Sequence, residues 1–322
     1  MNGLCLKEVS KTYKGKVDNI ALKKTSLQYN ENQIIGLLGD NGAGKTTLLK
    51  SIINIVQPTE GTIDLNSKNL RKMNNKEKAR TVFFVAEGTR SLWWRLTVAE
   101  NIRFICQMMW GNWKTVKNSL DSYLEVFDLT DKKNTLVGEL SRGQQQKVCI
   151  LLAVVADSPL IIMDEPTLGL DVSSRQEIAE MILAAKKKSK RKTFIISSHD
   201  MEFVAKVADR ITVLKEGKLI ANGTIDELRK LLQNNYTHFR IKDTLNEKQV
   251  SFLESNFELE IKNTENGEIY FEISDERSLK NKIIDYLRSE EICIDYIQEH
   301  KGTLESLFVE LQGGKYENIG NF

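Results

Sequence analysis

The sequence predicts an α/β protein with a largely parallel sheet, followed by a smaller α+β domain. Three observations lead to this prediction. Over residues 1–230, short β-rich apolar runs alternate with helical patterns, as is typical of layered α/β folds. After Leu232 the expected order of elements becomes β-α-β-β-α-β. The charge changes at the same place, because residues 1–230 hold 36 basic and 26 acidic groups whereas residues 231–322 hold 10 and 18.

The chain is therefore expected to form two domains, residues 1–230 and 231–312, with a loose tail at 313–322. In the first domain, strands are expected at 33–38, 81–85, 160–163, 193–197 and 211–214. The stretch up to Asn30 indicates antiparallel strands and turns. Apolar residues at helical spacing, such as Val98, Ile102 and Ile105, predict a helical insert over about 90–155.

The second domain is expected to have the split-βαβ arrangement of ferredoxin-like folds. Its predicted strands are 236–241, 257–262, 268–273 and 292–298, and its predicted helices are 246–255 and 278–289. A further helix with an apolar stripe, 304–311, is expected to pack on it. The sequence of this domain offers no catalytic cluster, so a pairing or regulatory surface is its expected role.

Composition excludes several classes of protein. With 322 residues, 41% of them hydrophobic, the chain is long enough and apolar enough to bury a core in each domain. The longest apolar run, residues 148–156, is about half of what a membrane span requires, and the first residues lack the apolar core of a secretory signal. We therefore expect a cytosolic protein. The scattered Cys5, Cys106, Cys149 and Cys293 are expected to be reduced and mostly buried.

One segment matches the phosphate-loop pattern between an expected strand and an expected helix. Its residues are Gly39, Asp40, Asn41, Gly42, Ala43, Gly44, Lys45, Thr46 and Thr47. The glycines allow backbone N–H groups to face a β-phosphate at a helix N-terminus. Lys45 is expected to bridge β- and γ-phosphate oxygens, and the Thr46 hydroxyl to bind Mg²⁺.

Two carboxylates follow the apolar strand at 160–163. Asp164 and Glu165 would lie at the carboxyl edge of the sheet, where open α/β sheets bind ligands. Beside a phosphate loop, Asp164 is expected to hold Mg²⁺ through water and Glu165 to act as the base that activates the attacking water.

With the segment Leu140-Ser141-Arg142-Gly143-Gln144, these motifs resemble the ATP-binding subunit of ATP-binding cassette (ABC) transporters over about residues 1–225. The resemblance implies a P-loop ATPase domain with an antiparallel β subdomain and a helical subdomain. It also implies that two copies, or this chain and a similar ATPase, enclose two ATP molecules, each phosphate loop facing the partner's Ser141, Gly143 and Gln144. Ser141 is expected to cap the helix 144–155, which offers an anion site without a phosphate in its own subunit.

Other residues acquire roles from the same resemblance. Tyr13 lies where the family stacks a ring on adenine, although such a tyrosine is also typical of a half-exposed strand. The loop Leu168–Asp171 resembles one that carries signals between subunits. His199 matches the histidine that contacts the γ-phosphate.

Two residues depart from the family pattern. Glu87 stands where the family usually has a Gln that binds Mg²⁺ and water, and its carboxylate would add negative charge near the γ-phosphate. Arg142 replaces a glycine; its cation favours phosphate, whereas its bulk hinders closure. These departures motivate an alternative, a nucleotide-gated binding protein with little hydrolysis.

The segment after Glu87 resembles that of ABC subunits that serve ABC-2 type exporters. Trp93 and Trp94, beside Arg95, either form a socket for a cytoplasmic helix of a membrane permease or pack inside the helical insert. The resemblance implies a subunit on the inner face of the cell membrane that powers export, with import as the alternative. The basic run 186–192 fits a solvated helix end, so no nucleic acid partner is expected. The transported substrate is not specified by this sequence.

Overall fold

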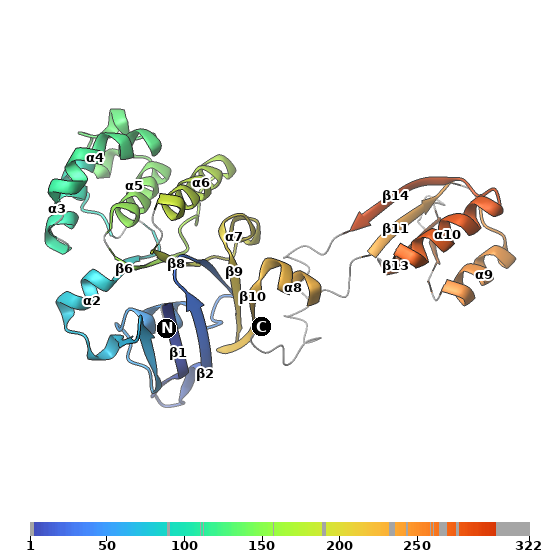
Figure 1. Cartoon of the computed structure of the whole chain (residues 1–322), viewed down its shortest axis with the longest axis horizontal. Coiled ribbons are helices and arrows are strands. Elements are labelled where there is room, and N and C mark those ends of the chain that lie inside the picture. The colour runs from blue at the N-terminus through green and yellow to red at the C-terminus, as the bar shows by residue number, and fades with distance from the viewer. Residues whose placement is uncertain are drawn as a thin grey trace. The chain divides into compact units, whose positions relative to one another are not determined.

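A computed structural model describes residues 3–88, 91–109, 111, 113–156, 158–188, 191–231, 236–242, 244–257, 259, 261–263, 269–274 and 277–300. The chain divides into two compact units, with the boundary between Ile225 and Asp226 (Figure 1). No helix among these residues is both long enough and apolar enough to cross a bilayer.

The first unit is built on a six-stranded sheet with the order β10-β9-β3-β8-β7-β6. Its strands are β3 (Ile34–Leu38), β6 (Val82–Val85), β7 (Leu160–Asp164), β8 (Thr193–Ser197), β9 (Arg210–Lys215) and β10 (Lys218–Thr224). All neighbours pair in parallel except β9 and β10. Every residue of β3, β7 and β8 is buried, since both faces of a parallel sheet are covered. The five strands predicted for this domain are confirmed; β10 was not predicted.

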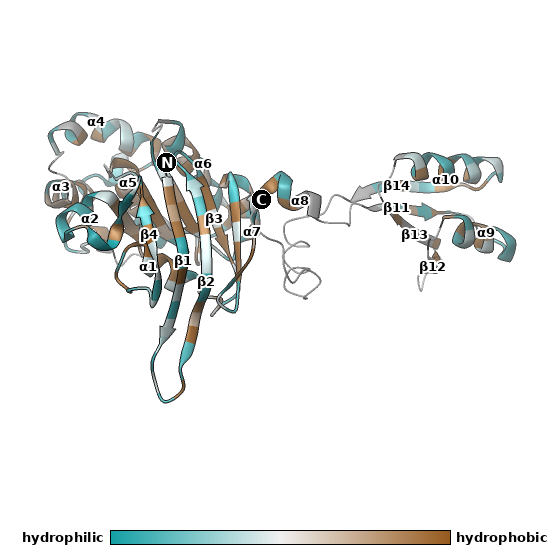
Figure 2. Cartoon of the chain, turned by 60° about the horizontal axis from the view of Figure 1, so that its bottom comes forward, coloured by the Kyte–Doolittle hydropathy of each residue, from teal (hydrophilic) through white to brown (hydrophobic). Residues whose placement is uncertain are grey.

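A second, antiparallel sheet with the order β2-β1-β4-β5 packs against the first. It contains β1 (Gly3–Tyr13), β2 (Asn19–Asn30), β4 (Glu60–Leu65) and β5 (Lys68–Asn69). The antiparallel prediction up to Asn30 is confirmed. Leu6 and Leu27 share one core with Ile35 of β3 and Leu48 of α1 (Lys45–Ile52). Figure 2 shows brown, apolar segments along the strands of this unit, β1 and β3 among them.

Helices cover the parallel sheet and form the insert. They are α2 (Asn75–Thr81), α3 (Val98–Met109), α4 (Trp113–Val126), α5 (Arg142–Val155), α6 (Val172–Lys188) and α7 (Met201–Val207), with short 3₁₀ turns at Leu70–Lys72, Thr130–Lys132 and Val137–Glu139. The short helix α8 (Ile225–Leu231) begins at the boundary between the two units. The helical insert is confirmed by α3 and α4, whose apolar faces bury Ile102 and Leu124. The expected thiol burial holds for Cys106 and Cys149, whereas Cys5 is half-buried and Cys293 exposed.

The second unit has the predicted β-α-β-β-α-β order. Its elements are β11 (Tyr236–Ile241), α9 (Glu247–Phe257), β12 (Ile261–Asn263), β13 (Ile269–Ser274), α10 (Arg277–Ser289) and β14 (Ile294–His300), and its antiparallel sheet has the order β12-β13-β11-β14. Phe239 and Phe271 stack in its own core.

One predicted strand of the second unit begins too early. The prediction of 257–262 is wrong at its start, because α9 continues through Phe257, one turn after the buried Leu253 and on the same apolar stripe. The predicted helix 304–311 and tail 313–322 lie outside the described residues.

Candidate nucleotide site

The phosphate loop connects β3 to α1 in a conformation that needs its glycines. Gly44, the N-cap residue of α1, has a φ of 100° and provides no side-chain cap. A Cβ on Gly44 would lie 2.5 Å from the carbonyl oxygen of Ala21, whereas one on Gly42 would meet nothing within 4 Å. The first N–H groups of α1 therefore face the loop without a capping side chain, as an anion site at a helix N-terminus requires.

Lys45 folds back over this loop. Its Nζ donates to the carbonyl oxygen of Gly39 at 2.5 Å and lies 3.4 Å from that of Asp40, and its side chain is buried. Asp40 also accepts the backbone N–H of Ala43 at 3.0 Å. The ammonium group is thus held inside the loop, where it can transfer its hydrogen bonds to phosphate oxygens.

The carboxyl ends of three neighbouring strands bring the acidic residues to this loop. Asp164 pairs in register with Ser197, and Ser197 pairs with Leu37 at the end of β3. The Thr46 hydroxyl lies 3.4 Å from Oδ2 of Asp164, and the Ser197 hydroxyl donates to Oδ1 of Asp164 at 2.5 Å. A hydroxyl and a carboxylate side by side are hard oxygen donors of the kind Mg²⁺ prefers, so the residues present fit that ion.

Glu165 has an unusual backbone conformation. Its φ of 48° is rare for a residue with a side chain. The backbone N–H of Glu165 donates to both the carbonyl and the hydroxyl oxygen of Ser197, each at 3.1 Å, and these bonds hold the turn. The Glu165 carboxylate, 13% exposed, lies 2.9 Å from Nδ1 of the 61% exposed His199. The structure thus brings the two predicted catalytic side chains together.

Glu87 is exposed and follows β6, the strand paired with β7. Val85 pairs with Met163, so Glu87 and Asp164 leave the sheet at the same edge. This placement is compatible with the predicted metal role of Glu87, which stays a prediction.

Tyr13 ends β1; the residue is 40% exposed, and the Lys11 ammonium lies 5.0 Å from the centre of its ring. It pairs with Asn19, two residues before Ala21, whose carbonyl oxygen packs against Gly44. Tyr13 is therefore accessible and lies on the strand pair whose second strand reaches the phosphate loop at Ala21; its adenine-stacking role stays a prediction.

The Ser141 segment begins α5 with a complete capping box. The Gln144 N–H donates to the Ser141 hydroxyl at 3.2 Å, and Gln144 Oε1 accepts the Ser141 N–H at 3.1 Å. Ser141 is exposed and is the N-cap of α5, as predicted, although the helix begins at Arg142 and not at Gln144. Among the described residues, no hydrogen bond or ion pair joins residues 141–144 to residues 39–47.

Sequence reasoning missed several residues that order the site. Ser197 binds both Asp164 and Glu165. Arg175 links the carbonyl oxygen of Leu170 at 3.1 Å to the Asp200 carboxylate at 2.7 Å, directly after His199. Ser197 could have been predicted from the sequence, because β8 ends at the same edge of the sheet as Asp164. The contacts of Arg175 could not, because they depend on tertiary packing.

A mononucleotide-binding loop, an acidic strand end and an apolar parallel sheet define a P-loop ATPase domain. The family model described as "ABC transporter" matches residues 22–168. NatA of Bacillus subtilis, an ABC transporter ATP-binding protein, is 32% identical over 208 residues, which cover 65% of this chain and 83% of NatA. The chain belongs to the ABC transporter family of ATP-binding proteins, and its first unit is an ABC-type ATPase domain.

Other relatives differ in size and described role. The mouse (Mus musculus) retinal-specific phospholipid-transporting ATPase ABCA4 is 33% identical, but the match spans only 9% of its length and 69% of this chain. The methionine import ATP-binding protein MetN 1 of Bacillus cereus is 31% identical, and the match covers 69% of this chain and 65% of the length of MetN 1. Among solved structures, a dimeric ATP-binding cassette in a post-hydrolysis state with ADP and Pi matches with a TM-score of 0.62 and 27% identity. The match covers 69% of this chain and 98% of the chain in that structure.

Proposed function

We propose that two copies of this chain bind two ATP molecules head to tail, and that their hydrolysis powers export through separate membrane permease subunits. The observation that supports a dimer is that two half-sites lie apart within one chain. The phosphate-loop half-site comprises residues 39–47, Asp164 and Glu165, and the Ser141 half-site comprises residues 141–144. The second is an exposed helix start that, in the part of the chain that the structure describes, shares no hydrogen bond or ion pair with the first, so a partner's γ-phosphate would complete it.

The roles of the residues follow from their placement. Lys45 and the N–H groups at the start of α1 bind and orient the β- and γ-phosphates. Thr46 and Asp164, with Glu87 as a further candidate, would hold Mg²⁺, which neutralises charge on the transferred phosphate. Glu165 accepts a proton from the attacking water, and His199 positions the carboxylate through its Nδ1.

The Glu165–His199 pair supports hydrolysis over a nucleotide-gated reporter, because a reporter does not need a base held at the phosphate edge. The departures at Glu87 and Arg142 leave this base intact. Steady-state ATP turnover by the purified chain tests the choice: sustained phosphate release supports the ATPase, and stoichiometric ATP binding without release supports the reporter.

An apolar surface on the helical insert supports a permease partner. Trp93 and Trp94 are 55% and 57% exposed, so the alternative that both rings pack inside the insert is wrong. The buried Asn101 fixes this turn, accepting the Trp93 N–H at 2.8 Å and donating to the Trp93 carbonyl at 3.0 Å. Trp93 meets Phe104 of α3 edge to face at 5.3 Å. Both tryptophans are therefore largely exposed, on a turn that Asn101 holds by hydrogen bonds.

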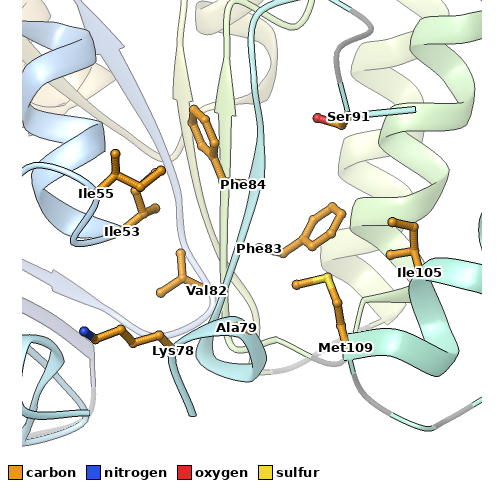
Figure 3. A pocket seen from close by; sticks show the side chains of 10 residues that line it. All are labelled: Ile53, Ile55, Lys78, Ala79, Val82, Phe83, Phe84, Ser91, Ile105 and Met109. Atoms are coloured by element: carbon orange, nitrogen blue, oxygen red, sulfur yellow. The ribbon is translucent and has the colours of Figure 1, made fainter. Parts of the chain in front are cut away.

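A pocket of about 320 Å³ opens along β6 on the same unit. Figure 3 shows Phe83, Ile105 and Met109 turned toward one another on one side of it, with Val82 and Ile53 on the other. A short amphipathic helix of a permease, with apolar residues for this groove, fits its chemistry.

Co-purification tests the permease contact. We expect Trp93→Ala with Trp94→Ala to lose a co-expressed membrane permease, while Val126→Ala, which removes an equally exposed side chain from α4, retains it. Equal recovery of permease by all variants would contradict this surface. ATPase activity of each isolated variant controls for folding.

We propose that transport runs in the export direction, because the segment after Glu87 resembles that of exporter subunits. MetN 1, described as an import protein, supports import as the second candidate. In vesicles with the ATPase on the outside, export predicts that ATP drives substrate into the lumen, and import predicts that it drives substrate out.

We also propose residues 231–312 as an accessory domain that supports pairing or regulation. Among the described residues, no cluster of three or more His, Cys, Asp or Glu side chains is arranged to hold a metal ion. Deletion of this domain is expected to leave ATP binding by residues 1–230 intact and to change dimer stability or turnover.

A further inference from the structure

A pocket of about 460 Å³ lies against the antiparallel sheet of the first unit. Its lining comes from the end of α1 and the residues after it, from β4 and from the 3₁₀ turn Leu70–Lys72. It shares no described lining residue with the groove along β6 or with either half-site. Its volume is in the range of pockets that take small molecules, about 300–1,000 Å³.

The pocket is separate from the phosphate loop. The first residue of α1, Lys45, belongs to the loop, whereas Ser51, in the last turn of the same helix, lines the pocket. A rise of about 1.5 Å per residue places these two residues about 9 Å apart along the helix axis. The Ser51 hydroxyl donates to the Thr47 carbonyl at 2.8 Å inside the helix. A phosphate bound in the loop therefore does not fill this pocket.

The floor of the pocket is apolar and already packed. Ile63 of β4 and Leu70 line it, and they are only 5% and 2% exposed. Both belong to the core that the antiparallel sheet shares with β3 and α1. The half-buried Pro58 extends the apolar lining. An apolar group placed on this floor leaves water without displacing a core side chain.

The rim of the pocket carries two cations and no acid. Arg71 and Lys72 are exposed lining residues, and in the part of the chain that the structure describes neither makes an ion pair. The Arg71 guanidinium contacts the Gln57 amide oxygen at 3.4 Å. No lining residue that the structure describes is acidic, and Glu60 of β4 is paired with Lys24 at 3.1 Å. The rim therefore favours an anion, and the guanidinium fork matches a carboxylate or a phosphate.

Two polar side chains of the wall are available to a ligand. Asn54 and Thr62 line the pocket, and among the described residues neither side chain takes part in a hydrogen bond. The Asn54 backbone, with a φ of 58°, is held by the bond from its N–H to the Ser51 carbonyl at 3.1 Å. A few fixed polar groups above an apolar floor are the usual composition of a small-molecule pocket.

We propose that this pocket binds a small amphipathic anion, with its apolar part on Ile63 and Leu70 and its carboxylate or phosphate at Arg71 and Lys72. The order of polarity favours a free molecule over a membrane lipid. A lipid headgroup entering from a bilayer would bring its charge to the apolar floor and leave its chains outside, which reverses that order. This binding needs neither ATP nor the proposed dimer, so it goes beyond the proposed function.

Titration calorimetry of the full chain without nucleotide tests the site, with octanoate as the probe. We expect saturable binding at a single site per chain. Removal of both rim cations by Arg71→Gln with Lys72→Gln should weaken it by about tenfold or more, because charge-assisted hydrogen bonds are lost. Lys68→Gln with Lys76→Gln removes two exposed lysines that do not line the pocket. This matched control should bind octanoate as the parent does.

The length of the probe tests the floor independently of charge. From butanoate to octanoate, we expect affinity to rise by up to about fourfold for each CH₂ group that leaves water. The rim variant should keep this dependence on length, which also shows that its floor is still folded. Octanamide has the shape of octanoate without the charge, so it should bind the parent and the rim variant equally.

Several results would overturn the proposal. They are no saturable binding of octanoate by the parent, equal affinity for inorganic phosphate, or competitive displacement of octanoate by Mg-ATP, which would assign the pocket to the nucleotide site. Binding to phosphatidylglycerol vesicles through Arg71 and Lys72, without binding of octanoate, would assign it to a lipid surface instead.

ATP turnover separates this site from the proposed function. The rim variant should hydrolyse ATP as the parent does, because neither Arg71 nor Lys72 lies in a half-site. A chain that binds octanoate but does not hydrolyse ATP would contradict the ATPase and leave the pocket supported. A chain that hydrolyses ATP but does not bind octanoate would do the reverse.

Discussion

The two half-sites of this chain differ in how their charges are satisfied. In the phosphate-loop half-site, Lys45 is buried and bonded to the Gly39 carbonyl, and Asp164 is bonded by Ser197. In the Ser141 half-site, Arg142 is exposed and has no carboxylate partner among the described residues, and Ser141 caps only its own helix. The first half-site is organised by hydrogen bonds within the chain, whereas the second presents the first N–H groups of α5 at an exposed helix start.

The largest effect is expected at the base of the phosphate-loop half-site. Glu165→Gln retains size and the backbone bonds to Ser197 but cannot accept the proton, so we expect turnover to fall by about 10²- to 10⁴-fold with ATP binding kept. Phosphate release and nucleotide binding measure the two effects separately. Glu139→Gln, in the 3₁₀ turn before Ser141, is the matched control, and near-normal turnover by Glu165→Gln would refute the assignment.

The next largest effect is expected on ATP affinity, when Lys45 of the phosphate loop is removed. Lys45→Ala removes charge-assisted hydrogen bonds worth about 1.5–3 kcal/mol, so ATP affinity should fall by about 10- to 150-fold. Equilibrium binding of labelled ATP measures this change. Lys50→Ala, in the last turn of the same helix, should bind ATP as the parent does; equal losses in both variants would mean a general effect on α1.

A smaller effect is expected at Tyr13. Tyr13→Ala removes a stacking surface, which is worth about 1–3 kcal/mol per base. We expect the lower end of this range because Tyr13 is 40% exposed. We expect a KM for ATP several-fold higher with little change in kcat, and full recovery in Tyr13→Phe. An unchanged KM for Tyr13→Ala would leave the residue as an ordinary strand position.

The smallest effect is expected from thiol labelling, which tests whether α5, the helix that begins at the Ser141 half-site, is tightly packed. Burial raises the pKa of the Cys149 thiol on α5 to about 12 and that of Cys106 on α3 to about 11. A raised pKa keeps both thiols protonated and unreactive at pH 8. We expect an alkylating reagent to modify exposed Cys293 first and all four thiols only after unfolding. Labelling of Cys149 as fast as Cys293 would show that α5 is not a packed support.

The phosphate-loop half-site was largely predictable because its chemistry is local in sequence. Glycine spacing, Lys45 and the strand before Asp164 each leave a short pattern, and parallel strands place their ends at one edge. The second unit was predictable for a similar reason, since its periodicity is regular, although the end of α9 depended on packing of Phe257.

What the sequence did not predict depends on contacts between distant segments. The bonds of Ser197 to Asp164 and Glu165 require β7 and β8 to pair, and the contact of Arg142 with Gly169 requires α5 to meet the loop after Glu165. The sequence left open whether Trp93 and Trp94 are buried or exposed, because two adjacent tryptophans are found both in cores and on docking surfaces.

A mixing experiment tests most directly that ATP lies between Lys45 of one copy and Ser141 of another. In the Glu165→Gln background, Lys45→Ala weakens ATP binding at the phosphate loop and Ser141→Glu opposes phosphate by charge. At a Mg-ATP concentration just sufficient to dimerise the Glu165→Gln parent, each variant alone should therefore stay monomeric in sedimentation. Their mixture retains one intact pair of half-sites and should form dimers. A mixture that stays monomeric while the Glu165→Gln parent dimerises, or either variant dimerising alone like that parent, would contradict the account.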